Sequence, residues 1–286
     1  MIVDSHCHAW RYWPYEPPVP DPESRGTIEQ LLWEMDQNGV DKAVVICARI
    51  EQNPDNNDYI AYQARRFPDR IYQFADVDCR WWETYHQPGA ADRLRQAVHR
   101  YGLRGFTHYF DPQDDGSWYL SEEGLAFLQT AVDLHQIASF ALPARLQPVL
   151  RQLAERFPTL HFLCHHMAGA RLAEGPDGGQ GLREIVKSAA LPNIHVKLSG
   201  FHYLNPVGWD FPHVVGRPVV QALYEHFGPE RLHWGSDYPV LRKAMTYQQS
   251  LEVVRTHCDF ISSADMSRIL GDSLYDLLER HGAASR

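Results

Sequence analysis

Short apolar runs alternate with amphipathic segments along the whole chain of 286 residues, and this pattern leaves few possible folds. A segment such as "TIEQLLWEMDQNG" has Ile28, Leu31, Leu32 and Met35 at helical spacing, and Gly39 can end the helix. The apolar runs are rich in β-branched and aromatic residues, which predicts strands. These runs are "IVDSHCH", "KAVVICARI", "IYQFADVD", "LRGFTHYF", "IASFALPA", "LHFLCHH", "NIHVKLSG" and "RLHWGSD".

Strands that alternate with helices favour parallel pairing through helical crossovers, and eight such pairs at this length favour closure into a barrel. We therefore expect an α/β protein with a (β/α)8 TIM-barrel fold and a single domain over residues 1–286. An open, doubly wound sheet is the alternative. It is disfavoured because "MIVDSHCHAW" has no glycine-rich phosphate-binding turn after the first strand.

The segment 10–26, "WRYWPYEPPVPDPESRG", combines prolines with four aromatic residues directly after the first predicted strand. No linker or repeat divides the chain elsewhere. Because the catalytic end of such a barrel is built from the loops that follow the strands, we expect residues 10–26 to form an aromatic lid.

Composition excludes several classes of partner. The net charge is −9 without a cluster of basic residues, so nucleic acid is not expected as a partner. No apolar run is long enough to span a membrane, and no signal peptide precedes the first strand. The five cysteines form no CxxC pair, so we expect reduced thiols in a cytoplasmic protein. The expected partner is a small-molecule substrate, and the sequence leaves both a monomer and a homo-oligomer open.

Histidines gather at the ends of the predicted strands. His6 and His8 are two residues apart on the first strand, so their side chains point to the same face. His166 ends the sixth strand and Asp237 ends the eighth, which is next to the first in a closed barrel. Three imidazoles and one carboxylate suit zinc or a similar divalent ion. The alternatives are two unrelated histidines and an Asp237 that only caps the following helix.

These residues also resemble a known family. "DSHCH", "FLCHHMAG", "NIHVKLSG", "RLHWGSDYPV" and "ILGDSLYDLL" are similar to segments of the amidohydrolase-related TIM-barrel hydrolases (amidohydrolase family 2), in particular the branch with sugar lactonases and pyrone-dicarboxylate lactonase. The resemblance implies that Asp237 handles the hydrolytic water. It also implies that His6, His8 and His166 hold a metal or polarise the substrate carbonyl, since catalysis without a metal is possible in this branch.

The expected reaction is water attack on a lactone or ester of a small ring substrate, with Asp237 and His166 as catalytic residues. Two alternatives remain at this stage. One is a metal-dependent decarboxylase or hydratase of an unsaturated carboxylic acid, and the other is a barrel that binds metal or sugar without catalysis.

Other candidates follow from position. Aromatic residues, arginines and a histidine near the strand ends could contact the substrate: Trp10, Trp13, Arg49, His108, Arg145, Tyr238 and Arg242. Related proteins often have an acidic residue where this chain has His165. Alternation along the strand predicts that His165 points away from His166 and is structural, and that Lys197 faces the barrel interior.

Overall fold

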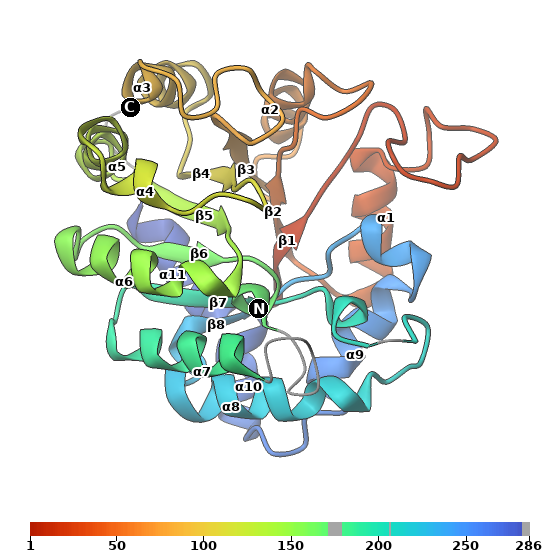
Figure 1. Cartoon of the computed structure of the whole chain (residues 1–286). Helices are drawn as coiled ribbons and strands as arrows, with labels where there is room; N and C mark the ends of the chain where they lie inside the picture. The colour runs from red at the N-terminus through yellow and green to blue at the C-terminus, as the bar shows by residue number, and fades with distance from the viewer. Residues whose placement is uncertain (171–178, 206, 282–286) are drawn as a thin grey trace.

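A computed structural model describes residues 1–170, 179–205 and 207–281. The described strands form one parallel sheet in the order β1 to β8. In Figure 1 the strands occupy the centre of the molecule and the helices surround them. The strands are β1 (Val3–Cys7), β2 (Lys42–Ile46), β3 (Ile71–Asp76), β4 (Gly105–Tyr109), β5 (Ile137–Ala141), β6 (Phe162–Cys164), β7 (Ile194–Leu198) and β8 (Leu232–Trp234).

Helices follow the strands around the barrel, as the amphipathic segments predict. In the first helix, the Thr27 side chain accepts a hydrogen bond from the backbone N–H of Gln30, and Gly39 ends the helix at a φ of 66°. The α-helices are α1 (Ile28–Asn38), α2 (Asn56–Arg66), α3 (Ala90–Tyr101), α4 (Ser117–Leu120), α5 (Glu122–Asp133), α6 (Gln147–Arg156), α7 (Gln180–Lys187), α8 (Arg217–Phe227), α9 (Tyr247–Arg255), α10 (Ser263–Ser267) and α11 (Ser273–Arg280).

The barrel closes between β1 and the segment that follows β8. The Asp237 N–H donates to the His6 carbonyl at 2.7 Å, and the His8 N–H donates to the Tyr238 carbonyl at 2.6 Å. A Cβ on Gly235 would lie 2.8 Å from the Cβ of His6, so only glycine lets the two segments approach this closely. The single-domain (β/α)8 barrel predicted from the sequence is thus confirmed.

Helix α11 covers the end of the barrel opposite the catalytic loops. Leu274, Leu277 and Leu278 of this helix are buried in one cluster with side chains from the strands. These side chains are Val3, Val44, Ile46, Phe74, Ile137 and Leu163. The barrel is therefore packed at its amino-terminal end, and polar groups concentrate toward the other end.

Within the three described stretches of chain, no helix combines the length and apolarity needed to cross a lipid bilayer.

Candidate active site

Asp237 lies in the turn after β8, where its backbone has an unusual conformation. Its φ is 62°, in the left-handed region that few non-glycine residues adopt. The Asp4 carboxylate steadies this turn, because it accepts hydrogen bonds from the Ser236 N–H at 2.9 Å and the Tyr247 hydroxyl at 2.9 Å. Strain of this kind at a buried carboxylate is typical of a functional position.

Three histidines face one oxygen of Asp237. The distances to Asp237 Oδ1 are 3.6 Å from His6 Nε2, 3.7 Å from His8 Nε2 and 4.0 Å from His166 Nε2. Asp237 and His6 are buried, and among the described residues neither Asp237 Oδ1 nor His6 Nε2 has a hydrogen-bond partner. Buried polar atoms without partners are costly, so this arrangement indicates a place for a ligand, an ion or water.

The donor set fits a divalent metal ion. The ligand atoms of His6, His8 and Asp237 all lie within 4.8 Å of one another, and ligands of a tetrahedral zinc ion stand roughly 3.3 Å apart. His8 Nδ1 lies 2.7 Å from the Ile46 carbonyl, and this contact requires the proton on Nδ1. The Nε2 lone pair of His8 is therefore free to bind an ion.

The pKa values of the cluster also suit a bound metal ion. Burial raises the pKa of Asp237 to about 8, although the hydrogen bond from Tyr203 opposes this shift. Burial lowers the pKa of His8 to about 4 and that of His6 well below its usual value, so both imidazoles are neutral near pH 7. A cation among these groups would favour the ionised form of Asp237 and suits neutral imidazole ligands.

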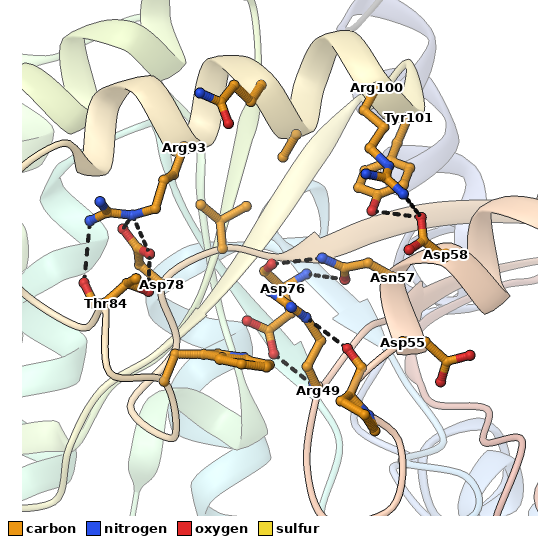
Figure 2. Close-up of a pocket in the computed structure, with 15 residues that line it drawn as sticks. Arg49, Asp55, Asn57, Asp58, Asp76, Asp78, Thr84, Arg93, Arg100 and Tyr101 are labelled. Atoms are coloured by element: carbon orange, nitrogen blue, oxygen red, sulfur yellow. Dashed lines mark hydrogen bonds and ion pairs between the residues drawn. The ribbon is translucent and has the colours of Figure 1, made fainter.

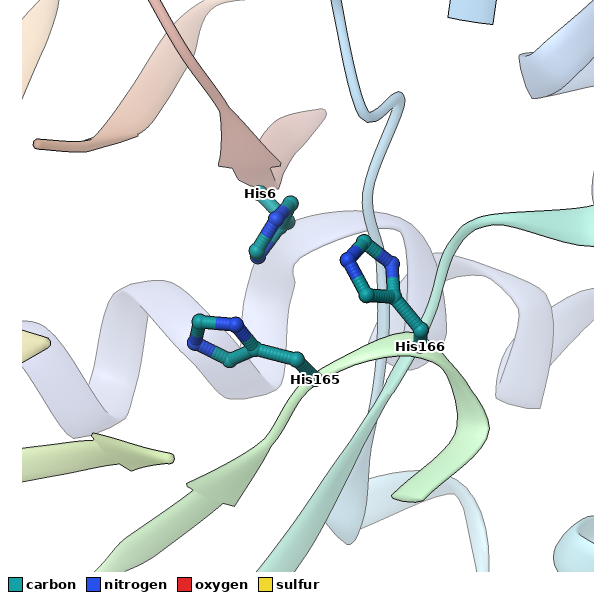
Figure 3. A group of neighbouring side chains, drawn as sticks. All are labelled: His6, His165 and His166. Atoms are coloured by element: carbon teal, nitrogen blue, oxygen red, sulfur yellow. The ribbon is translucent and has the colours of Figure 1, made fainter. Parts of the chain in front are cut away.

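His165 departs from the prediction that it points away from His166. Figure 3 shows His165 and His166 both directed toward His6, and the ring centroids of His165 and His6 are 4.4 Å apart. The reason is that β6 ends at Cys164, while His166 already has a φ of 45°, so strand alternation does not extend to these two residues. His6, His165 and His166 form a second group with metal-ligand spacing.

Lys197 is buried inside the barrel, as predicted, and connects several of these groups. Its amine donates to Ser139 Oγ at 2.6 Å and lies 3.4 Å from His6 Nδ1. Ser139 Oγ in turn lies 2.7 Å from His165 Nε2. Burial lowers the pKa of Lys197 to about 7. The floor of the site is thus a connected polar network, which fixes the orientation of the histidine rings.

Tyr203 completes the surroundings of Asp237 and was not among the predicted catalytic residues. Its hydroxyl donates to Asp237 Oδ2 at 2.9 Å, so the second carboxylate oxygen has a partner while Oδ1 faces the histidines. Tyr203 lies in the short helical turn Phe201–Tyr203 after β7. The adjacency of the seventh and eighth strands could have indicated this contact from the sequence.

A cavity of about 710 Å³ opens beside the histidines. Its floor includes His165, His166 and Tyr203, and one wall is apolar through Phe110, Leu142 and other residues of the loops after β4 and β5. Arg145 lines this cavity, as does Arg80, which the sequence analysis did not single out.

The remaining candidate substrate contacts are dispersed. Trp10 is buried and stacks on His8 with ring centroids 5.5 Å apart, whereas Tyr238 is buried beside Tyr247. Trp13 and Arg242 line a separate cavity of about 430 Å³ next to the proline-rich loop.

Arg49 and His108 lie away from the histidine cluster. Arg49 lines a cavity of about 450 Å³ beside α2 and α3 (Figure 2). The guanidinium carbon of Arg49 lies 3.8 Å from the centroid of the Trp82 ring. His108 is buried, and its two ring nitrogens contact the Val77 carbonyl and the Tyr119 hydroxyl. His108 follows the alternation of β4 toward the outer helices, whereas Arg49 lies in the loop three residues beyond the end of β2.

Comparisons with known proteins agree with this architecture. A model of the amidohydrolase family matches residues 3–274. L-fucono-1,5-lactonase of Burkholderia ambifaria is 28% identical over 253 residues, which are 85% of this chain and 81% of the relative. L-fucono-1,5-lactonase of Burkholderia multivorans is 24% identical, with 95% of this chain and 93% of the relative covered.

A solved structure of an amidohydrolase from Burkholderia multivorans with bound zinc is similar in fold. It has a TM-score of 0.77 at 21% identity and covers 98% of this chain and 99% of its own. Because the family model covers nearly the whole barrel, from the first strand to the last helix, this chain belongs to the amidohydrolase family.

Proposed function

We propose that this protein is a lactonase, which opens the lactone or ester of a small ring substrate by water attack. The observation that carries the proposal is the buried carboxylate of Asp237, whose Oδ1 atom faces His6, His8 and His166. His166 also lines the open cavity beside this cluster. The similarity to two proteins named L-fucono-1,5-lactonase supports the same reaction class.

Asp237 is the proposed general base. The water oxygen forms a bond to the carbonyl carbon while Asp237 takes the water proton, and the bond from this carbon to the ring oxygen then breaks. Asp237 returns the proton to the departing ring oxygen, which leaves a hydroxy acid as product. Tyr203 holds Oδ2 at 2.9 Å and so keeps the carboxylate in a fixed orientation through both transfers.

His6, His8, His166 and Asp237 would hold the metal ion, with zinc as the proposed ion because imidazole and carboxylate ligands suit it. When bound, the ion would polarise the lactone carbonyl and favour the ionised form of Asp237. The serine contact of His166, whose Nδ1 lies 3.0 Å from Ser199 Oγ, orients this ring toward the cluster.

Residues 10–26 are the proposed lid of the site. The Trp10 ring stacks on His8. The backbone N–H of Trp10 donates to the Gly26 carbonyl at 2.6 Å, which ties the two ends of the segment together. Tyr15 packs edge-on against both Trp10 and Trp13. An aromatic segment held this close to the histidines can shield the reacting centre from bulk solvent.

The proposal is tested by measuring the hydrolysis of a panel of lactones through the protons that the reaction releases. The metal content of the same preparation is assayed in parallel. We expect turnover of at least one ring lactone and about one divalent ion per chain. His6→Ala combined with His8→Ala should remove both the ion and the activity, whereas His226→Ala on the exposed face of α8 should change neither.

Release of carbon dioxide from unsaturated carboxylic acids, without turnover of any lactone, would favour the decarboxylase alternative. Ligand binding without turnover on either panel would favour a non-catalytic barrel. An active preparation without metal that is insensitive to chelators would support histidines acting as hydrogen-bond donors to the carbonyl.

A further inference from the structure

His165 is buried beside the histidine cluster and has one ring nitrogen without a partner. It lines the same cavity as His166 and Tyr203. Among the described residues, His165 Nδ1 is a buried atom with no hydrogen-bond partner, as are His6 Nε2 and Asp237 Oδ1. A buried polar atom that stays unpaired is costly, so His165 Nδ1 is placed to pair with an atom of a ligand.

The orientation of the His165 ring is fixed by its surroundings. The backbone N–H of His165 donates to the Phe140 carbonyl at 2.9 Å, and its Nε2 atom lies 2.7 Å from Ser139 Oγ. The ring also packs edge-on against Tyr109, with ring centroids 5.2 Å apart. Because Nε2 is turned to Ser139, Nδ1 is on the side of the ring that faces His6 (Figure 3). The unpaired nitrogen is therefore held in the site before a ligand binds.

The hydrogen bonds of Ser139 determine which nitrogen of His165 carries a hydrogen. Lys197 donates to Ser139 Oγ at 2.6 Å, so the hydroxyl hydrogen of Ser139 still needs an acceptor. The other contact of this hydroxyl within the described chain is His165 Nε2, which therefore accepts the hydrogen. Burial holds the pKa of His165 well below its usual value, so the ring is neutral near pH 7. Its one N–H group is consequently at Nδ1.

A hydrogen on Nδ1 gives His165 a different role from that of a metal ligand. The ligand atoms of His6, His165 and His166 have metal-ligand spacing. A ring nitrogen binds a metal ion through its lone pair, however, and a protonated Nδ1 has none to offer. In His8 the hydrogen is also on Nδ1, but there the Ile46 carbonyl accepts it and Nε2 faces the cluster. His165 instead presents a hydrogen-bond donor to the site.

We infer that His165 is a further catalytic residue, whose Nδ1–H group donates a hydrogen bond to the carbonyl oxygen of the lactone. Ser139 is the positioning residue that keeps the hydrogen on Nδ1. This inference rests on the proposed lactonase function. As the water oxygen attacks, an electron pair of the C=O bond moves to the carbonyl oxygen, and the N–H group stabilises this negative charge without losing its proton. A fixed donor of this kind typically contributes about 10²-fold to 10³-fold to kcat.

Two substitutions of His165 separate this role from packing. In a shared rotamer, the amide of asparagine takes about the place of Nδ1, and the amide of glutamine takes about the place of Nε2. His165→Gln can keep the contact with Ser139 but has no donor at the Nδ1 position. Its kcat on the best lactone should therefore fall by at least about 10²-fold, with KM within about threefold. His165→Asn keeps a donor toward the site and should retain kcat to within about tenfold. His226→Gln on the exposed face of α8 is the control and should change neither quantity.

The position of the hydrogen is measured by NMR, independently of turnover. The side-chain nitrogen signals that disappear from the spectrum in His165→Gln belong to His165. In the wild-type protein these signals should show a hydrogen on Nδ1 and none on Nε2. Ser139→Ala removes the hydroxyl that fixes this tautomer. It should shift the two signals toward a mixture of tautomers and lower kcat, with KM within about threefold.

A hydrogen on Nε2 of His165 in the wild-type protein would overturn the inference. A folded His165→Gln variant with the wild-type kcat would also overturn it. So would a folded His165→Gln variant that loses a metal ion bound by the wild type, because His165 would then be a ligand of the ion. These results leave the lactonase function in place as long as the wild type hydrolyses a lactone. If the wild type hydrolyses none, the lactonase function fails, and the NMR signals still decide whether His165 presents a donor to the site.

Discussion

The two carboxylate oxygens of Asp237 have different surroundings. Asp237 Oδ1 faces three imidazole nitrogens, and Oδ2 accepts a hydrogen bond from Tyr203. A fourth histidine, His202, lies with its Nε2 atom 4.0 Å from Oδ2. Because a carboxylate that is held by one oxygen can move a proton at the other, the contact with Tyr203 should matter for turnover more than for substrate binding.

Tyr203→Phe removes only this hydroxyl group. A hydrogen bond to a charged group contributes about 1.5 to 3 kcal/mol, so kcat should fall about 10-fold to 100-fold. KM should change by less than about threefold, because the ring and its packing remain. Steady-state kinetics on the best lactone measures both quantities, and Tyr62→Phe on the exposed face of α2 is the matched control. An unchanged kcat would show that Tyr203 does not orient Asp237.

At the scale of secondary-structure elements, the geometry of the site depends on the contact between β1 and the turn after β8. This contact brings His6 and His8 beside Asp237, and Gly235 permits it because its missing side chain leaves room for His6 and Ser5. Overpacking at such a contact displaces both segments rather than one side chain.

Gly235→Ala should therefore destabilise the fold by about 1 to 3 kcal/mol and also reduce metal content. A Cβ at this position would lie 2.8 Å from both His6 Cβ and Ser5 Oγ. Gly208→Ala is the control, since among the described residues its Cβ would meet only Ala244 Cβ, at 3.8 Å. Denaturant unfolding of both variants measures the effect. Equal stability of the two variants would contradict the close approach described for Gly235.

Three histidines form a second network. His195 and His233 are buried on β7 and β8, and the half-buried His161 directly precedes β6. His161 Nδ1 lies 2.9 Å from His195 Nε2, and His195 Nδ1 lies 3.0 Å from His233 Nε2. Burial lowers the pKa of His233 to about 3, that of His161 to about 4 and that of His195 well below its usual value. The folded state thus excludes protons that the unfolded chain accepts.

The sign of the pH effect follows from these lowered pKa values. The stabilising contribution of each neutral histidine is complete above pH ~6.5 and is lost as the pH falls through the folded-state pKa. His195→Gln should therefore flatten the decline in the free energy of unfolding below pH ~6.5 by about 1.4 kcal/mol per pH unit relative to wild type. Denaturant titrations at several pH values measure the two slopes. Parallel slopes would mean that His195 does not titrate differently in the two states.

At the scale of the whole molecule, hydrophobic periodicity was sufficient to predict the fold and to predict that most of the site residues lie close together. Strand ends of a parallel barrel share one rim, so His6, His8, His166 and Asp237 could be placed together although they are far apart in sequence. Periodicity failed where the backbone leaves the strand geometry. His165 follows the end of β6, and its orientation depends on the turn at His166.

The candidate substrate contacts were harder to predict from the sequence. Arg49 and His108 lie near strand ends, yet their side chains belong to the outer layer between sheet and helices. Tyr203 and Arg80 reach the cavity from loops whose conformation depends on contacts such as that between Arg80 and the Tyr109 carbonyl. Loop conformation of this kind comes from tertiary packing and has no sequence period.

The turnover rate of Asp237→Asn measures whether Asp237 acts as the general base. The amide keeps nearly the same shape but cannot take a proton from water, so kcat on the best lactone should fall by about 10²-fold to 10⁴-fold while the protein remains folded. Asp133→Asn on the exposed face of α5 should keep wild-type activity. A folded Asp237→Asn protein that turns over the same lactone at close to the wild-type rate would contradict this role.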